Sequence, residues 1–360
     1  MTKSKLLAST MLVAAATAMS AVPANAVNLK IGGFGEYWIG YADNDRGTGA
    51  DADSNFDVKQ DAELYFHGEE TLDNGMKIGA RFELEAGNGN DNASGPGFDE
   101  SWAWVKTSFG QVNIGNNDVA TGYVGGVSTV GPVGIIKSDA SDWFAGSATE
   151  LNNTDVDLGL GDSQNITYFT PRVAGFQAIV SYTPDSSDTT TSDFDDQEVG
   201  GLHNGFSMAV KYSGKFSGAS VNLSGGYTTV ERTDATTTDN EASGYAVRGS
   251  IGYGAFTVTG AYAREDIADT DEFWGISGLY TMGKHKFSLA YGIGTETNPG
   301  QNIGDNENEV VTLGWERNLG KGATIAASVF RMSNERAGVA APNAALNDGY
   351  GVVTGLKLKF

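Results

Sequence analysis

Apolar and polar residues alternate along most of the chain after residue 26. In KFSLAYGIG (286–294), Phe, Leu, Tyr and Ile alternate with Ser, Ala and Gly. In MKIGARFELEA (76–86), apolar residues alternate with Lys, Gly, Arg and Glu. Successive side chains of a β-strand point to opposite faces, so a period of two predicts strands with one apolar face and one small or charged face.

Sixteen such strands are predicted, and the connections between them alternate in length. Short turns such as DNG (73–75) and NLGKG (318–322) alternate with long acidic loops such as DSSDTTTSDFDDQE (185–198). The predicted strands lie near 28–41, 56–69, 76–87, 98–108, 111–117, 164–171, 175–184, 204–214, 219–231, 243–253, 255–265, 271–282, 285–296, 308–318, 323–335 and 348–360.

This pattern predicts an all-β fold, a 16-stranded antiparallel transmembrane β-barrel. Membrane barrels have short periplasmic turns and long outer loops, and closure leaves no sheet edge exposed to lipid. Tilted strands of this length cross a bilayer, and about sixteen of them enclose an aqueous lumen. A soluble β-sandwich is the alternative, but it would not require the alternation in loop length.

Composition supports an exported barrel and excludes other classes. Glycine accounts for 50 of 360 residues, about twice its ordinary share, and cysteine is absent. The aromatic and β-branched content is too high for a disordered chain. The net charge of −22 argues against a nucleic-acid partner, which would require clustered Lys and Arg.

The first residues predict export. A basic start, a short apolar run and the small residues ANA (24–26) are typical of a cleaved signal peptide over residues 1–26. The barrel domain is then 27–360. Loss of Lys3 and Lys5 changes the charge balance to 21 − 45 = −24.

The sequence ends in GLKLKF (355–360), which continues the alternation to the last residue. Leu356, Leu358 and Phe360 share the predicted outward face, and Phe360 would join a periplasmic aromatic girdle. Gly355, Leu358 and Phe360 also match a C-terminal pattern that resembles the signal read by the outer-membrane barrel-insertion machinery.

Three stretches together resemble the general diffusion porins of Gram-negative outer membranes. They are AELYFHGEETLDNGMKIGARFELE (62–85), SWAWVKTSFGQVNIGNN (101–117) and NITYFTPRVAGFQAIVSY (165–182). The resemblance implies a homotrimer of sixteen-stranded barrels, in contact with outer-membrane lipid and lipopolysaccharide. It also implies that the third outer loop, here 119–163, folds inward and narrows the channel.

A narrowed porin channel carries acids on the loop and bases on the facing wall. The loop candidates are Asp139, Asp142, Glu150 and Asp155, and an ordinary exposed acidic loop is the alternative for each. The lumen-facing bases predicted from strand parity are Lys59, Arg81, Lys106 and Arg248, of which Arg81 lies nearest mid-strand. Lys106, like Lys77, lies close to a periplasmic turn, and a position at the membrane interface is the favoured interpretation for both. Asn116 and Thr167 stand where resembling porins often carry basic residues, so a dense arginine cluster is not expected.

The predicted function is passive diffusion of ions and small hydrophilic solutes, without catalysis. Inward acids outnumber the mid-strand bases, which predicts a mild preference for cations; these acids are Glu36, Asp61, Glu63, Glu83 and Glu85.

Three alternatives remain open at this stage. The inward aromatic residues Phe34, Trp38, Trp102 and Trp104 are consistent with a substrate-specific channel, for example for a sugar. A structural or adhesive barrel would have a closed lumen. A barrel hydrolase would need a histidine with a partner at the outer rim, and only His203 lies there, with no partner evident.

No cofactor is predicted. The acidic loop DNDRGTGADAD (43–53) supplies closely spaced carboxylates that are a secondary candidate for Ca²⁺, although its spacing is not that of an EF-hand.

Overall fold

The computed structural model describes residues 27–44, 55–86, 98–135, 140, 143, 154–186, 201–233, 241–267, 270–297, 305–335 and 348–360. The predicted signal segment 1–26 lies outside these residues, as does most of the candidate Ca²⁺ loop 43–53.

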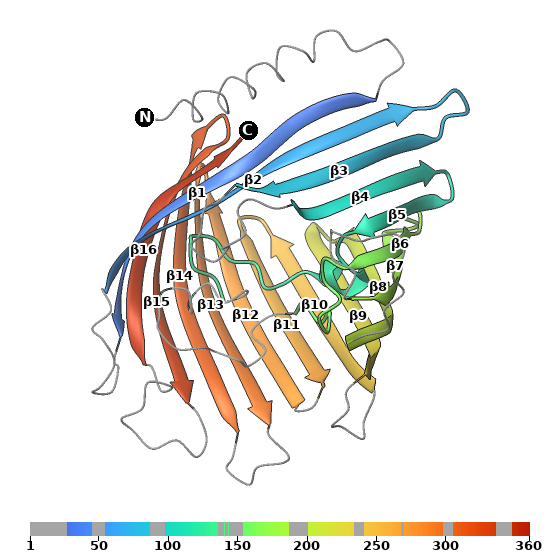
Figure 1. The fold of residues 1–360 in the computed structure, drawn as a ribbon. Helices are drawn as coiled ribbons and strands as arrows, with labels where there is room; N and C mark the ends of the chain where they lie inside the picture. The colour runs from blue at the N-terminus through green and yellow to red at the C-terminus, as the bar shows by residue number, and fades with distance from the viewer. Residues whose placement is uncertain are drawn as a thin grey trace, which may run out of the picture.

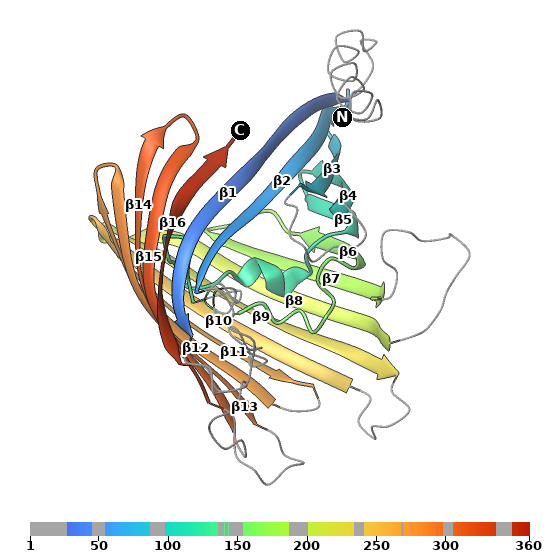
Figure 2. The same cartoon turned by 60° about the vertical axis from the view of Figure 1, so that its left-hand side comes forward.

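The strands form one closed antiparallel barrel in which each strand pairs with its neighbours in the chain (Figures 1 and 2). They are β1 (Asn28–Asn44), β2 (Phe56–Thr71), β3 (Lys77–Glu85), β4 (Phe98–Thr107), β5 (Gly110–Asn116), β6 (Gln164–Phe169), β7 (Phe176–Asp185), β8 (Gly201–Phe216), β9 (Ala219–Thr233), β10 (Glu241–Tyr253), β11 (Phe256–Asp266), β12 (Thr270–Met282), β13 (His285–Thr297), β14 (Asn306–Gly320), β15 (Ala323–Glu335) and β16 (Gly349–Lys359). The predicted fold class and strand number are confirmed.

Several strands are longer than the alternation predicts. β14 covers Asn306–Gly320 rather than 308–318, and β8 covers Gly201–Phe216 rather than 204–214. Strands pair through backbone groups, so the ladder continues into polar segments that no longer show an apolar face. Within the described residues, η2 (Ala120–Val124) is a short 3₁₀ helix, and no helix is long and apolar enough to cross a membrane.

The first and last strands close the barrel. Gly35 pairs with Leu358, and Trp38 pairs with Gly355. The Gly33 N–H donates to the Phe360 carbonyl at 2.9 Å, and the Phe360 N–H donates to the Gly33 carbonyl at 3.1 Å. The C-terminal residue is therefore part of the ladder.

The two faces of the barrel differ as the alternation requires. On β13, Leu289 and Tyr291 are exposed on the outer face, whereas Ser288 and Ala290 are buried inside. Large aromatic side chains are exposed at the strand ends near the short turns; they include Phe109, Phe216, Tyr253, Phe256 and Phe360. An apolar outer band ending in an aromatic girdle is the surface that a bilayer requires.

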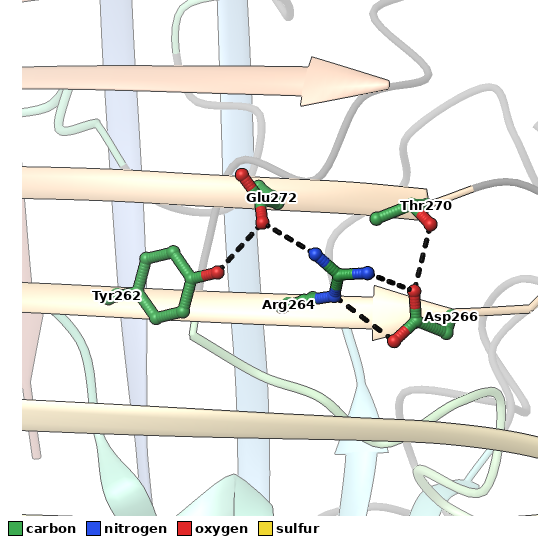
Figure 3. A network of polar contacts seen from close by, with 5 residues as sticks. All are labelled: Tyr262, Arg264, Asp266, Thr270 and Glu272. Atoms are coloured by element: carbon green, nitrogen blue, oxygen red, sulfur yellow. Dashed lines mark hydrogen bonds and ion pairs between the residues drawn. The ribbon is translucent and has the colours of Figure 1, made fainter. Parts of the chain in front are cut away.

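The outer face becomes polar where the strands reach the long loops. On β11 and β12, the Arg264 guanidinium bonds Asp266 and Glu272, each at 2.9 Å (Figure 3). Thr270 and Tyr262 donate to the same two carboxylates, at 2.8 and 2.9 Å. Each charge in this network has a partner, and the network lies at the long-loop end of the apolar band.

Replacement of Phe360 by Ala should reduce assembly more than it reduces the stability of the finished barrel. The side chain is 67% exposed on the outer face, and its burial in lipid contributes about 2 kcal/mol. The expected result is a lower yield in the outer membrane with little change in melting temperature. Normal yield combined with a clearly lower melting temperature would contradict the role in assembly.

Candidate functional site

The connection between β5 and β6, residues 117–163, is the longest in the barrel and contains η2. Its described part lies inside the ring of strands (Figures 1 and 2). We refer to residues 117–163 as the inward loop. Apolar residues predominate along its described first arm, and Ala120, Val124, Val127 and Val133 are buried against the wall.

The first arm of the inward loop is held by hydroxyl groups on β8 and β9. The Thr121 N–H donates to Ser207 Oγ at 3.0 Å, and Ser224 Oγ donates to the Val124 carbonyl at 2.7 Å. The Thr121 hydroxyl also donates to the carbonyl of Val156 on the returning arm, at 3.0 Å. The two arms of the loop are thereby joined to the wall and to each other.

Further along, the loop crosses β13, β14 and β15. Val130 N–H donates to Ser288 Oγ at 3.0 Å, and Val133 N–H donates to Ser328 Oγ at 3.2 Å. Thr312 Oγ1 donates to the Val133 carbonyl at 2.8 Å. A buried backbone group without a partner is costly, so these inward hydroxyls make it possible for an irregular segment to pack inside the barrel.

Glycines under the loop permit close approach. A Cβ on Gly314 would overlap the Val130 carbonyl, and a Cβ on Gly40 would overlap the Trp143 ring. The small inward residues of the wall therefore fit the path of the loop.

Arg248 of β10 binds the loop backbone. Its Nε donates to the Gly126 carbonyl at 2.6 Å, and its Nη2 donates to Ser128 Oγ at 3.2 Å. The sequence predicts Arg248 as a base that faces the solute path. That role stays a prediction, and the contacts add an anchoring role that parity alone does not reveal.

Arg81 of β3 lies on the opposite part of the wall. It forms an ion pair with Glu83, and its guanidinium carbon is 4.2 Å from the centre of the Tyr65 ring and 5.5 Å from that of Trp102. The ring contacts fix the guanidinium by cation–π attraction. Arg81 is therefore held in the lumen beside an acid, the placement that a transverse field requires.

Lys59 of β2 marks a point where wall and loop meet. Its ammonium is 3.3 Å from Asp57 and 5.5 Å from the centre of the Trp143 ring, which belongs to the loop. Asp155 is half-buried on the returning arm, next to Thr154, whose hydroxyl donates to the Gly125 carbonyl at 3.0 Å. The other loop candidates, Asp139, Asp142 and Glu150, lie outside the described residues.

Two groups of acids converge beside Arg81. Glu100, Asp118 and Asp162 form one, and Glu63, Glu85 and Asp99 the other, with carboxylate oxygens within 4.8 Å of one another in each. Such groups have the spacing of a divalent-cation site but are common without an ion. Strand parity predicts that Glu63, Glu83 and Glu85 point inward. It does not predict the group of Glu100, Asp118 and Asp162, because the loop brings these three together.

Crowding changes the acidity of Asp162, which lies in the turn before β6. Partial burial, with repulsion from Asp99 and Asp118, raises the pKa of this carboxyl from its ordinary 3.8 to about 6. A hydrogen bond with Glu100 opposes this rise.

Asn116 and Thr167, which stand where resembling porins often carry basic residues, have structural roles in this chain. Thr167 is fully buried, and its hydroxyl lies 2.6 Å from Ser181 Oγ and 2.8 Å from Asn165 Oδ1. Asn116 is also buried and donates to the Asp99 carbonyl at 3.2 Å.

His203 at the outer rim has partners that the sequence does not reveal. Its Nε2 lies 3.4 Å from Glu231, and its Nδ1 lies 3.5 Å from Thr233 Oγ1. These residues come from paired positions of β8 and β9. A threonine at this distance is too far for an activated nucleophile, and the contact with Glu231 joins two paired strands at the rim.

Comparison with known proteins gives a family and a fold. A family model described as "Gram-negative porin" matches residues 8–337. No curated protein sequence matches the chain significantly.

Solved porin structures resemble the barrel over nearly its whole length. An anion-selective porin from Comamonas acidovorans has a TM-score of 0.63 and 19% identity, with 92% of this chain and 99% of that chain covered. OmpT of Vibrio cholerae, described as a trimer form, has a TM-score of 0.61 and 15% identity, with coverages of 93% and 100%. OmpF of Salmonella typhi, in complex with daunomycin, has a TM-score of 0.66 and 12% identity, with coverages of 94% and 99%.

Replacement of Gly314 by Ala should loosen the inward loop while the barrel still closes. The added methyl group overlaps the Val130 carbonyl, and overpacking of this kind costs about 1–3 kcal/mol. The expected result is faster amide hydrogen exchange over residues 127–135. Gly278→Ala is the matched control, because a Cβ there meets no atom within 4 Å. Equal exchange in the two variants would show that the loop does not depend on this contact.

The raised pKa of Asp162 predicts a pH-dependent stability. The folded chain holds the proton up to about pH 6, whereas the unfolded chain loses it near 3.8, so stability should fall as pH rises between these values. Asp162→Asn should therefore melt higher than the unchanged protein at pH 7.5 but not at pH 3.5. The carboxylate keeps contact with water, so the gain should be below about 1 kcal/mol. A gain that is equal at both pH values would contradict the assignment.

Proposed function

We propose, since this chain belongs to the Gram-negative porin family, that it forms a water-filled channel for passive diffusion of ions and small hydrophilic solutes. The family and the barrel support an outer-membrane porin channel. Proteins of this family are channels rather than enzymes, and we propose no catalytic role and no required cofactor for this chain.

The observation that carries the proposal is the asymmetric lumen. Hydroxyl and glycine residues hold the inward loop against one side of the wall, through contacts such as Val130 with Ser288 and Val133 with Ser328. Arg81 lies on the opposite part of the wall, paired with Glu83. Lys59 lies where the loop meets the wall, paired with Asp57. An aqueous passage between a fixed loop and a charged wall filters solutes by size and charge.

We propose a mild preference for cations. Six acids make up the two groups described above, on β2 to β4 and the inward loop, and Arg81 of β3 is already paired with Glu83. Lys357 is likewise shared by Glu36 and Glu316, at 3.3 and 3.5 Å. Arg81 and Lys357 are thus each paired with acids, and the two acidic groups leave an excess of negative charge at this level of the lumen.

We also propose a homotrimer in contact with lipopolysaccharide, exported with a cleaved signal peptide and delivered by the barrel-insertion machinery. The OmpT structure described as a trimer supports the trimer by similarity. The outer face of β1–β5 carries an apolar groove of about 580 Å³, lined by residues that include Leu29, Ile78, Phe82, Val105 and Ile114. A neighbouring protomer would cover this groove. Divalent cations such as Ca²⁺ would bridge the acidic loops to lipopolysaccharide phosphates.

The channel and its preference are tested together in a planar bilayer across a tenfold KCl gradient. The protein should conduct, with a zero-current potential of the sign for K⁺ over Cl⁻. The preference should weaken toward 1 M salt, where the Debye length falls to about 3 Å. Absence of conductance would overturn the channel, and anion selectivity at low salt would overturn the preference.

Arg81→Ala should increase the preference for K⁺. Loss of the interaction between a permeating ion and one partly exposed charge changes the free energy by about 0.5 kcal/mol, which corresponds to roughly a twofold change in the permeability ratio. Arg331→Ala is the control, because Arg331 lies exposed on the outer-facing positions of β15. An unchanged potential in Arg81→Ala would remove Arg81 from the ion path.

A further inference from the structure

A second feature of the lumen lies on the periplasmic side of the inward loop. The wall formed by β2 to β7 lines a cavity of about 690 Å³. Its lining reaches the short turns at Gly110 and Pro171, and Tyr123 of η2 contributes from the loop. Pockets of 300–1,000 Å³ accommodate small organic molecules.

Aromatic rings form much of the cavity wall. Trp102 and Trp104 of β4 line it, and His67 stacks on Trp104 with ring centres 6.2 Å apart and planes at 21°. Tyr123 of the loop meets Phe169 edge to face, with centres 5.0 Å apart. Rings from the wall and from the loop therefore both border the space, and such surfaces bind flat or ring-shaped solutes.

Positive charge accompanies these rings. Among the lining residues, Glu69 is the one acid, and it is paired with Lys77 at 2.8 Å. Lys106 and Arg172 also line the cavity, and neither forms an ion pair with any residue that the structure describes. Arg81, which is paired with Glu83, also lines the cavity and connects it to the acidic region. The cavity lining itself has an excess of cationic groups.

We propose that this cavity is a binding subsite for a small organic anion in which a carboxylate is attached to a ring. The ring lies against Trp102 and Trp104, and the carboxylate pairs with Lys106 and Arg172 through charge-assisted hydrogen bonds. The ring is either aromatic or that of a sugar acid, because both present a flat or apolar face to tryptophan. The proposal rests on the proposed channel, in which the subsite would be a stopping point for such solutes.

The cationic side chains of the cavity distinguish this subsite from a binding site for neutral sugars. A sugar channel needs aromatic platforms and hydrogen-bonding groups but no unpaired cations. Here Gln111, Asn113 and Gln177 supply neutral hydrogen-bonding groups in addition to the cations. A neutral sugar would leave Lys106 and Arg172 without a counter-charge, so a ring-bearing anion fits the whole lining better.

The test uses the full protein in detergent, with tryptophan fluorescence as the readout. Benzoate and glucuronate are titrated as ring-bearing anions, acetate as an anion without a ring, and benzamide and glucose as neutral ring compounds. At least one ring-bearing anion should give a saturable change at a concentration about tenfold lower than acetate, benzamide and glucose. Benzoate ahead of glucuronate identifies an aromatic acid, and the reverse order identifies a sugar acid.

Variants tie the signal to the cavity. Lys106→Gln should weaken binding of the ring-bearing anion about tenfold, and Trp102→Phe should reduce the fluorescence change. The matched controls are Lys286→Gln, at an inward position of β13 outside the cavity, and Trp274→Phe, on the outer face of β12. Both controls should bind as the unchanged protein does.

Current block in a planar bilayer separates this proposal from the proposed channel. Addition of the bound anion should reduce the conductance of the unchanged protein but not that of Lys106→Gln at the same concentration. Normal conductance with neither current block nor a saturable fluorescence change would overturn the subsite alone. Saturation by glucose at a lower concentration than any ring-bearing anion would overturn it as well. A protein that does not conduct would overturn the channel, while the fluorescence titration would still decide the subsite.

Discussion

The hydrogen bonds between the backbone of the inward loop and the hydroxyl groups of the barrel wall determine how the lumen is organised. An irregular segment can lie inside a barrel only if its backbone groups find partners there. Ser207, Ser288 and Ser328 provide those partners on three separate strands. Because these side chains are short, the loop lies close to the wall. The free passage is then confined to the other side of the lumen.

This confinement explains why the charged residues are unevenly distributed. Ser, Thr, Ala and Gly at inward wall positions let the loop lie close to the wall, and larger residues such as Phe273 and Phe330 pack in the same buried cluster as the loop. Arg248 is a charged member of this wall that anchors the loop, since its guanidinium bonds the loop directly. Long charged and aromatic side chains are tolerated on β2 to β4, where Arg81, Tyr65 and Trp102 pack together beside the passage.

The alternation of residues is sufficient to predict the fold, the strand number and the face on which each strand residue lies. Ser288 and Leu289 illustrate this, since neighbours in the chain lie on opposite faces as parity requires. Contacts made through the loop could not be predicted in this way. Parity places Arg248 inside the barrel but cannot show that it meets Gly126. The grouping of Glu100 with Asp118 and Asp162 likewise depends on how the loop leaves β5 and returns to β6.

The same loop divides the passage along its length. Its two ends bring Asp118 and Asp162 to the acidic group beside β4, whereas η2 carries Tyr123 to the aromatic and cationic cavity nearer the short turns. Under the two proposals, the acidic group favours a cation and the cavity favours a ring-bearing anion. Arg81 connects the two, because it lines the cavity and pairs with Glu83 of the acidic wall. The local placement of charge, rather than the net charge of the lumen, would then decide which solute is held at each point.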